Sequence, residues 1–174
     1  IYSKKKGIYQ NKKGISLKQF CKSNDWAIKA KIYDAFPKVA AQVDSTEWKP
    51  YWQPLSDQEI VQLAASPYAE VGLHAYYHDN LGRLPSQQAV ALIDRGKQYL
   101  EQLLQQPIRS FAYADGSYNT ALTDYLQKIG VKEQYIVDYL QPEDRKDERI
   151  KNRLTINPYT SLVHQVYAIL NGRY

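Results

Sequence analysis

Short apolar segments alternate with capped amphipathic helices from Ser56 to the end of this chain. Helices are predicted at 57–65, 86–104, 119–127 and 161–170, and strands at 70–73, 109–113, 134–137 and 153–156. A charged loop, Pro142 to Lys151, separates the last two strands. Because strands that alternate with helices usually pair in parallel, the pattern predicts an α/β fold with a mainly parallel sheet, open or closed into a barrel.

Polar side chains follow two of the predicted strands. His74 and His78 come after the strand at 70–73, and Asp115 comes after the strand at 109–113. In α/β folds ligands bind at the carboxyl ends of the strands. We therefore expect the functional site where these residues meet.

The spacing of the two histidines is compatible with a metal site. One turn of backbone can aim both imidazoles at one divalent ion, with zinc about 2.0–2.1 Å from each nitrogen. The alternative is that aromatic and polar neighbours satisfy both rings structurally. No Glu directly follows His74, so the zinc protease motif is absent.

Length and composition narrow the class of protein. The chain of 174 residues suits one domain, and no apolar run approaches the roughly 20 residues that cross a bilayer. A single cysteine, Cys21, excludes an intramolecular disulfide framework and a multi-cysteine zinc site. No secretory signal is recognisable in the chain, which begins at Ile1.

Basic residues are concentrated at the N-terminus. The net charge is +5, and the first 24 residues contain seven Lys and no acid. We predict a basic arm at 1–22 followed by one domain at 23–174, with the arm either solvated or in contact with an anionic polymer or lipid surface. No nucleic-acid motif accompanies the arm, so we expect no nucleic-acid partner.

Three segments carry a resemblance to a known family. Residues 70–81, EVGLHAYYHDNL, resemble the second motif of polysaccharide deacetylases of the NodB-homology type, carbohydrate esterase family 4. Residues 109–119, RSFAYADGSYN, resemble the third motif, although Ala114 replaces a usual Pro. Residues 153–162 are similar to the closing segment of extracytoplasmic members that act on poly-N-acetylglucosamine, and the resemblance extends over about 26–170.

The resemblance implies a fold, an activity and a location. The fold would be the family's distorted (β/α) barrel. The activity would be metal-dependent hydrolysis of acetamide groups on an N-acetylated amino-sugar polymer. His74 and His78 would bind the divalent ion, with zinc expected, and the Asp115 backbone amide would help to stabilise the oxyanion. The location would be the cell envelope or the exterior.

The first motif of the family, two adjacent aspartates, has no exact counterpart. The nearest match is Asn24-Asp25, because residues 35–39 resemble the helix that usually follows. Asp25 would be the third metal ligand and Asn24 would occupy the position of the general base, although an amide accepts no proton at neutral pH. A natural pseudoenzyme, an Asp-to-Asn substitution and residues missing near position 23 all remain open, as does simple capping of a helix that begins at Trp26.

Other roles are assigned with less support from the motifs. His164 is the remaining histidine for the catalytic acid, although a helix histidine without chemistry is the alternative, and Asp79 and Asp138 are polar residues that could orient a ligand. Tyr76, Tyr113 and Tyr118 flank the expected metal ligands and the turn at Asp115, and are predicted as substrate-binding residues. At least one of these rings is expected to line a cleft beside the metal and to stack on sugar rings, with core packing as the competitor for Tyr113.

Two other classes of function compete with the deacetylase. A carbohydrate-binding or scaffold domain could keep the fold without turnover, and Asn24 favours it. An unrelated α/β hydrolase or reductase is disfavoured, because the sequence contains neither a nucleophile elbow nor a glycine-rich phosphate loop.

Overall fold

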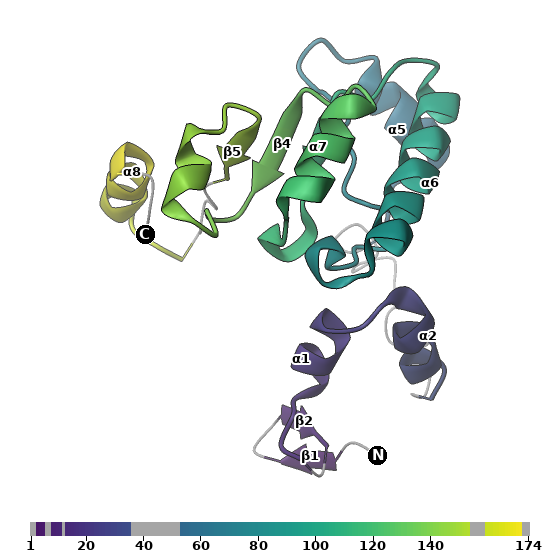
Figure 1. Cartoon of the computed structure of the whole chain (residues 1–174), viewed down its shortest axis with the longest axis vertical. Helices are drawn as coiled ribbons and strands as arrows, with labels where there is room; N and C mark the ends of the chain where they lie inside the picture. The colour runs from purple at the N-terminus through teal and green to yellow at the C-terminus, as the bar shows by residue number, and fades with distance from the viewer. Residues whose placement is uncertain (1–2, 6–7, 12, 36–52, 154–158, 172–174) are drawn as a thin grey trace. The chain divides into compact units, whose positions relative to one another are not determined.

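The computed structural model describes residues 3–5, 8–11, 13–35, 53–153 and 159–171 (Figure 1). The chain divides into two compact units. The first contains Ile1–Val71 and Tyr99–Gln106, and the second contains Gly72–Gln98 and Pro107–Tyr174. The long helix α6, Ser86–Leu104, contributes residues to both units.

The first unit is built from a hairpin and short helices. Strands β1 (Ser3–Lys5) and β2 (Ile8–Gln10) pair antiparallel, and helices α1 (Leu17–Lys22), α2 (Trp26–Ala35) and α5 (Asp57–Ala64) follow. Helix α5 begins with the predicted capping box: Glu59 N donates to Ser56 Oγ, and Ser56 N donates to Glu59 Oε2 at 2.7 Å. The prediction of this helix is thus confirmed to within one residue.

The predicted arm at 1–22 includes β1, β2 and α1, and its boundary with a following domain stays a prediction. Within the described ranges, no helix is both long enough and apolar enough to cross a bilayer.

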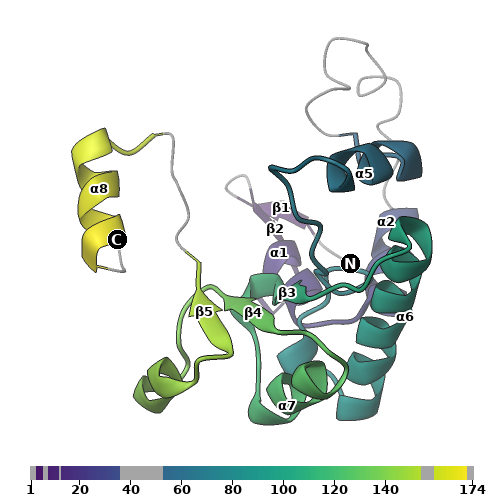
Figure 2. The ribbon, with the colours of Figure 1, turned by 90° about the horizontal axis from the view of Figure 1, so that it is seen from above.

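The second unit contains a parallel sheet of three strands. Its order is β3 (Ser110–Ala112), β4 (Glu133–Ile136) and β5 (Ile150–Asn152), which lie side by side in Figure 2. Leu73 adds one parallel bridge to Phe111, on the side of β3 away from β4. The predicted parallel α/β arrangement is confirmed, and the predicted strand at 70–73 is reduced to this bridge. The described strands do not show a barrel, which stays a prediction.

The last strand lies earlier than predicted. Strand β5 begins at Ile150, inside the segment expected to be a charged loop, whereas residues 154–156 of the predicted strand are outside the described ranges. Ile150 is buried in this strand, and the neighbouring charge of Arg149 is balanced by Asp147 and Asp124. The charged residues therefore do not prevent this segment from pairing with β4.

Helix α7 (Thr120–Lys128) packs on the sheet through a buried polar network. Its N-cap is Asn119, as predicted, and Leu122 and Leu126 are buried. The Gln134 side chain on β4 donates to Thr123 O at 2.9 Å and accepts from the Tyr113 hydroxyl at 2.7 Å. One buried amide thus connects the helix to the end of β3, and its hydrogen-bonding groups are satisfied.

Single turns and a final helix complete the second unit. The 3-10 turns are η1 (Leu81–Arg83), η2 (Ala114–Gly116) and η3 (Pro142–Lys146). Helix α8 (Leu162–Asn171) confirms the predicted terminal helix, and Ser161 Oγ accepts from His164 N at 3.4 Å at its start.

Arg149 connects the start of β5 to α7. Its guanidinium donates to Asp147 at 2.7 and 2.8 Å, to Asp124 at 2.8 Å and to Gln127 at 2.9 Å. The hydrogen bonds from Arg149 to Asp147 hold the pKa of the Asp147 carboxyl below its usual value of 3.8, so the ionised Asp147 stabilises the fold above that pH.

We therefore expect Arg149→Gln to lower the free energy of unfolding by about 1 kcal/mol at neutral pH. The difference between parent and variant should shrink as the pH falls below 3.8 and through the lowered pKa of Asp147, because protonation removes the ion pair. Urea unfolding at neutral and acidic pH measures both effects. A difference that stays constant into strong acid would contradict the assignment.

Gly116 and Gly130 both have left-handed backbone, with φ of 68° and 92°. A Cβ on Gly116 would lie 2.7 Å from Val137 Cβ and 3.0 Å from Val137 N, whereas nothing lies within 4 Å of a Cβ on Gly130. Each change to Ala should cost about 1–2 kcal/mol of backbone strain. Gly116→Ala should cost a further 1–3 kcal/mol, roughly, for overpacking. Parallel denaturant titrations would show this, and equal losses would refute the close approach to Val137.

Candidate active site

Pairing with β3 places His74 at the carboxyl edge of the sheet. Leu73 N donates to Ser110 O at 2.9 Å, and Ala112 N donates to Leu73 O at 2.8 Å. On α6, a Cβ at Gly96 would lie 2.8 Å from Leu73 Cδ1 and 3.4 Å from the Ala75 carbonyl. The backbone that carries His74 is therefore held between a strand and a closely packed helix.

The His74 ring is oriented by a backbone carbonyl. Its Nδ1 lies 2.5 Å from Ala112 O, and because a carbonyl only accepts, Nδ1 carries the proton and Nε2 keeps its lone pair. Burial lowers the pKa of His74 below 6.5, while the bond to Ala112 opposes this shift. The neutral ring is therefore favoured at physiological pH.

The structure brings the two predicted ligands together. The His74 and His78 rings lie edge to face, with centroids 4.7 Å apart. Histidines that bind metals commonly donate their other ring N–H to a carbonyl or carboxylate, and His74 does so with Ala112. The contact therefore brings together two side chains of a type that binds divalent ions, whereas no group of three possible ligands is assembled among the residues that the structure describes.

The predicted ligand Asp25 and the predicted base position Asn24 belong to the first unit. Asp25 Oδ1 accepts from Ile28 N at 3.1 Å, so Asp25 caps α2. Asn24 Nδ2 donates to Phe20 O at 2.7 Å at the end of α1. The capping role considered for this pair is thus present, and the roles of ligand and base stay predictions. Residues 36–39 of the supporting resemblance lie outside the described ranges.

The backbone of this site is strained. Ala75, His78 and Asp115 have φ of 58°, 57° and 53°, a region that residues other than glycine rarely adopt. Among the described residues, one further non-glycine position, Gln105, shares this conformation. Such strain costs about 1–3 kcal/mol per residue and concentrates at functional sites. It supports a functional role for the turns after Leu73 and Tyr113.

The three predicted substrate tyrosines differ in exposure. Tyr113 is 0% exposed, and its hydroxyl donates to Gln134, so the ring lies in the core as the alternative anticipated. Tyr118 is 6% exposed; its hydroxyl donates to Asp144 and accepts from Leu140 N, and burial raises its pKa to about 12. Tyr76 is partly exposed, with the Arg95 guanidinium 4.1 Å from its ring centroid.

The remaining polar candidates lie in different surroundings. His164 is exposed on α8, with Nδ1 2.9 Å from Ser161 Oγ, and Asp138 is exposed and accepts from Tyr139 N. Asp79 is buried at 1% exposure. These contacts do not select the catalytic acid among them.

Arg153 is a residue that sequence reasoning did not assign to the site. Its Nη2 donates to Tyr113 O at 2.8 Å and its Nε donates to Ile136 O at 3.3 Å. Its charge also contributes to the lowered pKa of His74. The sequence pattern did not indicate this position, because Arg153 was predicted to begin a strand at 153–156, whereas β5 ends directly before it at Asn152.

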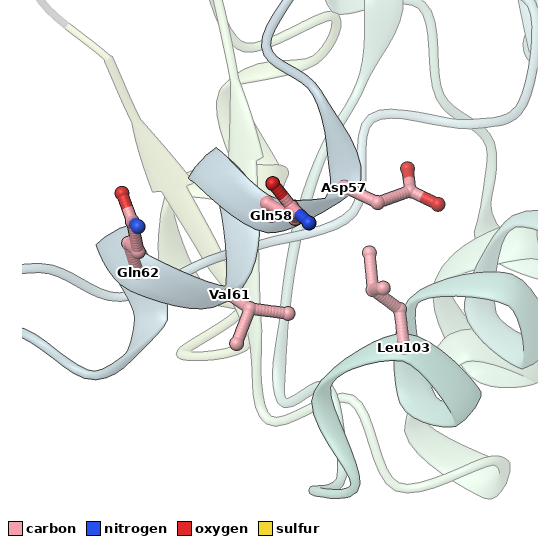
Figure 3. A pocket seen from close by; sticks show the side chains of 5 residues that line it. All are labelled: Asp57, Gln58, Val61, Gln62 and Leu103. Carbon is pink, nitrogen blue, oxygen red and sulfur yellow. The ribbon is translucent and has the colours of Figure 1, made fainter.

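A groove of about 500 Å³ lies in the first unit, between α5 and the end of α6 (Figure 3). Val61 and Leu103 form its apolar part, and Asp57, Gln58 and Gln62 complete its lining. Asp57 also accepts a hydrogen bond from the Tyr99 hydroxyl at 2.5 Å. None of the predicted site residues lines this groove.

Several solved structures share the fold of this chain. The deacetylase PplD of Streptococcus pyogenes, solved with acetate, is 16% identical with a TM-score of 0.57; 74% of this chain and 54% of PplD are covered. IcaB from Ammonifex degensii is 23% identical with a TM-score of 0.51, covering 67% and 55%. A polysaccharide deacetylase from Bacillus cereus is 19% identical with a TM-score of 0.52, covering 66% and 36%.

The chain thus spans about half the length of PplD and IcaB. No curated protein is significantly similar to it in sequence. The sequence pattern of the polysaccharide deacetylase family matches residues 17–134, a segment that includes His74, His78 and the turn at Asp115. On this match over more than half of its length, the chain belongs to the polysaccharide deacetylase family.

Proposed function

We propose that this chain is part of a metal-dependent enzyme that removes acetyl groups from an N-acetylated amino-sugar polymer. The observation that carries the proposal is the contact of the His74 and His78 rings at the carboxyl edge of a parallel sheet. Membership of the polysaccharide deacetylase family supports the same chemistry. The proposal includes closure of the sheet into the family's distorted barrel and a location in the cell envelope or outside the cell.

His74 and His78 would hold the ion, and Asp25 is the proposed third ligand. Imidazole nitrogens suit zinc, and the proton on His74 Nδ1 directs the Nε2 lone pair away from Ala112. When bound, such an ion would polarise the acetamide carbonyl and lower the pKa of water.

The turn at Asp115 would stabilise the developing oxyanion. Left-handed backbone at Asp115 and Gly116 turns the chain directly after β3, and Gly116 N donates back to Tyr113 O at 3.2 Å. A backbone amide held in such a turn can donate to an oxyanion without reorganising during the reaction. Of the three predicted tyrosines, Tyr76 is the ring that could stack on a sugar, in competition with Arg95.

The residue at the proposed position of the general base, Asn24, favours a second candidate function. If Asn24 occupies it, a proton acceptor is missing and turnover is slow or absent. The chain would then be a deacetylase-fold domain that binds carbohydrate or serves as a scaffold. Acetate release from an acetylated glucosamine oligomer, measured beside binding of the same oligomer, separates the two functions.

The metal site predicts the effect of removing either imidazole. His74→Ala and His78→Ala should each weaken zinc binding by at least about tenfold, because each removes one of three proposed protein ligands. Calorimetric titration with zinc and elemental analysis measure this. His164→Ala is the matched control and should bind as the parent does. Unchanged binding by both site variants would refute the metal site.

If Asn24 occupies the position of the general base, a carboxylate at this position should increase activity. Asn24→Asp should raise the rate of acetate release about 10²–10⁴-fold, because it supplies a carboxylate where the base is proposed. The change also removes the bond from Asn24 Nδ2 to Phe20 O, so Asn171→Asp is the control: Asn171 Nδ2 donates to Tyr167 O in the same spacing at 2.8 Å. No gain in Asn24→Asp, or an equal gain in the control, would show that the base lies elsewhere.

A further inference from the structure

Arg153 lies at the carboxyl end of β5 and reaches across the sheet. Its backbone N donates to Ile136 O at 2.9 Å, and its Nε donates to the same carbonyl at 3.3 Å. Its Nη2 donates to Tyr113 O at 2.8 Å. One side chain thus binds the carbonyl of Ile136, the last residue of β4, and the carbonyl of Tyr113, the residue that follows β3.

The carbonyl of Tyr113 is a central point of the proposed site. It accepts from Gly116 N, which closes the turn that contains Asp115. The preceding carbonyl, of Ala112, accepts from His74 Nδ1. A group that fixes Tyr113 O therefore fixes both the proposed oxyanion donor and the acceptor that orients a proposed metal ligand.

Arg149 and Arg153, which lie directly before and directly after β5, have different partners. Arg149 forms ion pairs with Asp147 and Asp124, whereas no carboxylate in the described part of the chain pairs with Arg153. A guanidinium presents its N–H donors in a rigid fork, so it can bind two carbonyls in fixed directions. A lysine carries the same charge without this fork.

We infer that Arg153 is a positioning residue, which holds the ends of β3 and β4 so that the Asp115 turn and the Ala112 carbonyl are aligned for catalysis. The effect on catalysis rests on the proposed deacetylase function, whereas the effect on the turn does not. Because misplacement by about 1 Å can cost 10²-fold in rate, loss of the fork should lower kcat about 10²-fold and leave KM nearly unchanged.

The test compares Arg153→Gln and Arg153→Lys with the controls Arg149→Gln and Arg149→Lys in the metal-free protein. In amide NMR spectra, both Arg153 variants should shift the Asp115 and Gly116 signals and accelerate exchange of the Gly116 amide. Both Arg149 variants should leave these signals in place even where they lower stability. Activity is then measured in each variant with Asn24→Asp present. Arg153→Lys should lose kcat as Arg153→Gln does, because lysine keeps the charge but lacks the fork.

Two results would overturn the inference. One is that Asp115 and Gly116 in folded Arg153→Lys give the parent's signals, because the fork would then be dispensable. The other is that the Arg149 controls shift these signals as much as the Arg153 variants, because the effect would then be general destabilisation. Absence of turnover in every protein would count against the proposed function, and the NMR comparison would still decide the role of Arg153.

Discussion

The backbone pairing of Leu73 with β3 determines where the proposed active site lies. Two hydrogen bonds align Leu73 beside Phe111, and the next residue, His74, reaches the Ala112 carbonyl. The approach is close: a Cβ on Gly72 would lie 2.6 Å from Ser110 Oγ. A single bridge thus fixes His74 and its tautomer at the carboxyl edge of the sheet, where its ring contacts that of His78.

The strained turns of the site depend on the stability of the packing below them. Left-handed backbone at Ala75, His78 and Asp115 is unfavourable and persists because the surrounding structure determines it. The sheet supplies the packing that holds these turns in place. It does so through buried apolar residues and through Gln134, which connects β4 with α7 and Tyr113. The Tyr113 ring therefore packs in the core, while its backbone carbonyl accepts hydrogen bonds from Gly116 N and Arg153 Nη2.

Two arginines close together in the sequence show how similar residues take different roles. Arg149 is neutralised by carboxylates and connects a loop to α7, which is a contribution to stability. Arg153 binds carbonyls at the strand ends, next to the groups proposed for catalysis. The difference follows from the strand between them, because β5 delivers one to its amino end and the other to its carboxyl end.

Local sequence determined those helices whose caps and apolar periodicity can be recognised within a few neighbouring residues. The caps at Ser56, Asn119 and Ser161 and the periodic apolar residues defined three helices, and the alternation with strands indicated a parallel sheet. The motif around His74 and His78 indicated the family. Tertiary structure alone decided that β5 begins at Ile150, that the rings of Tyr113 and Tyr118 are buried, and that Arg153 binds Tyr113 O. The physical reason is range: a cap is satisfied within one turn of helix, whereas burial and hydrogen bonds between strand ends depend on segments about 20 to 40 residues apart meeting in the fold.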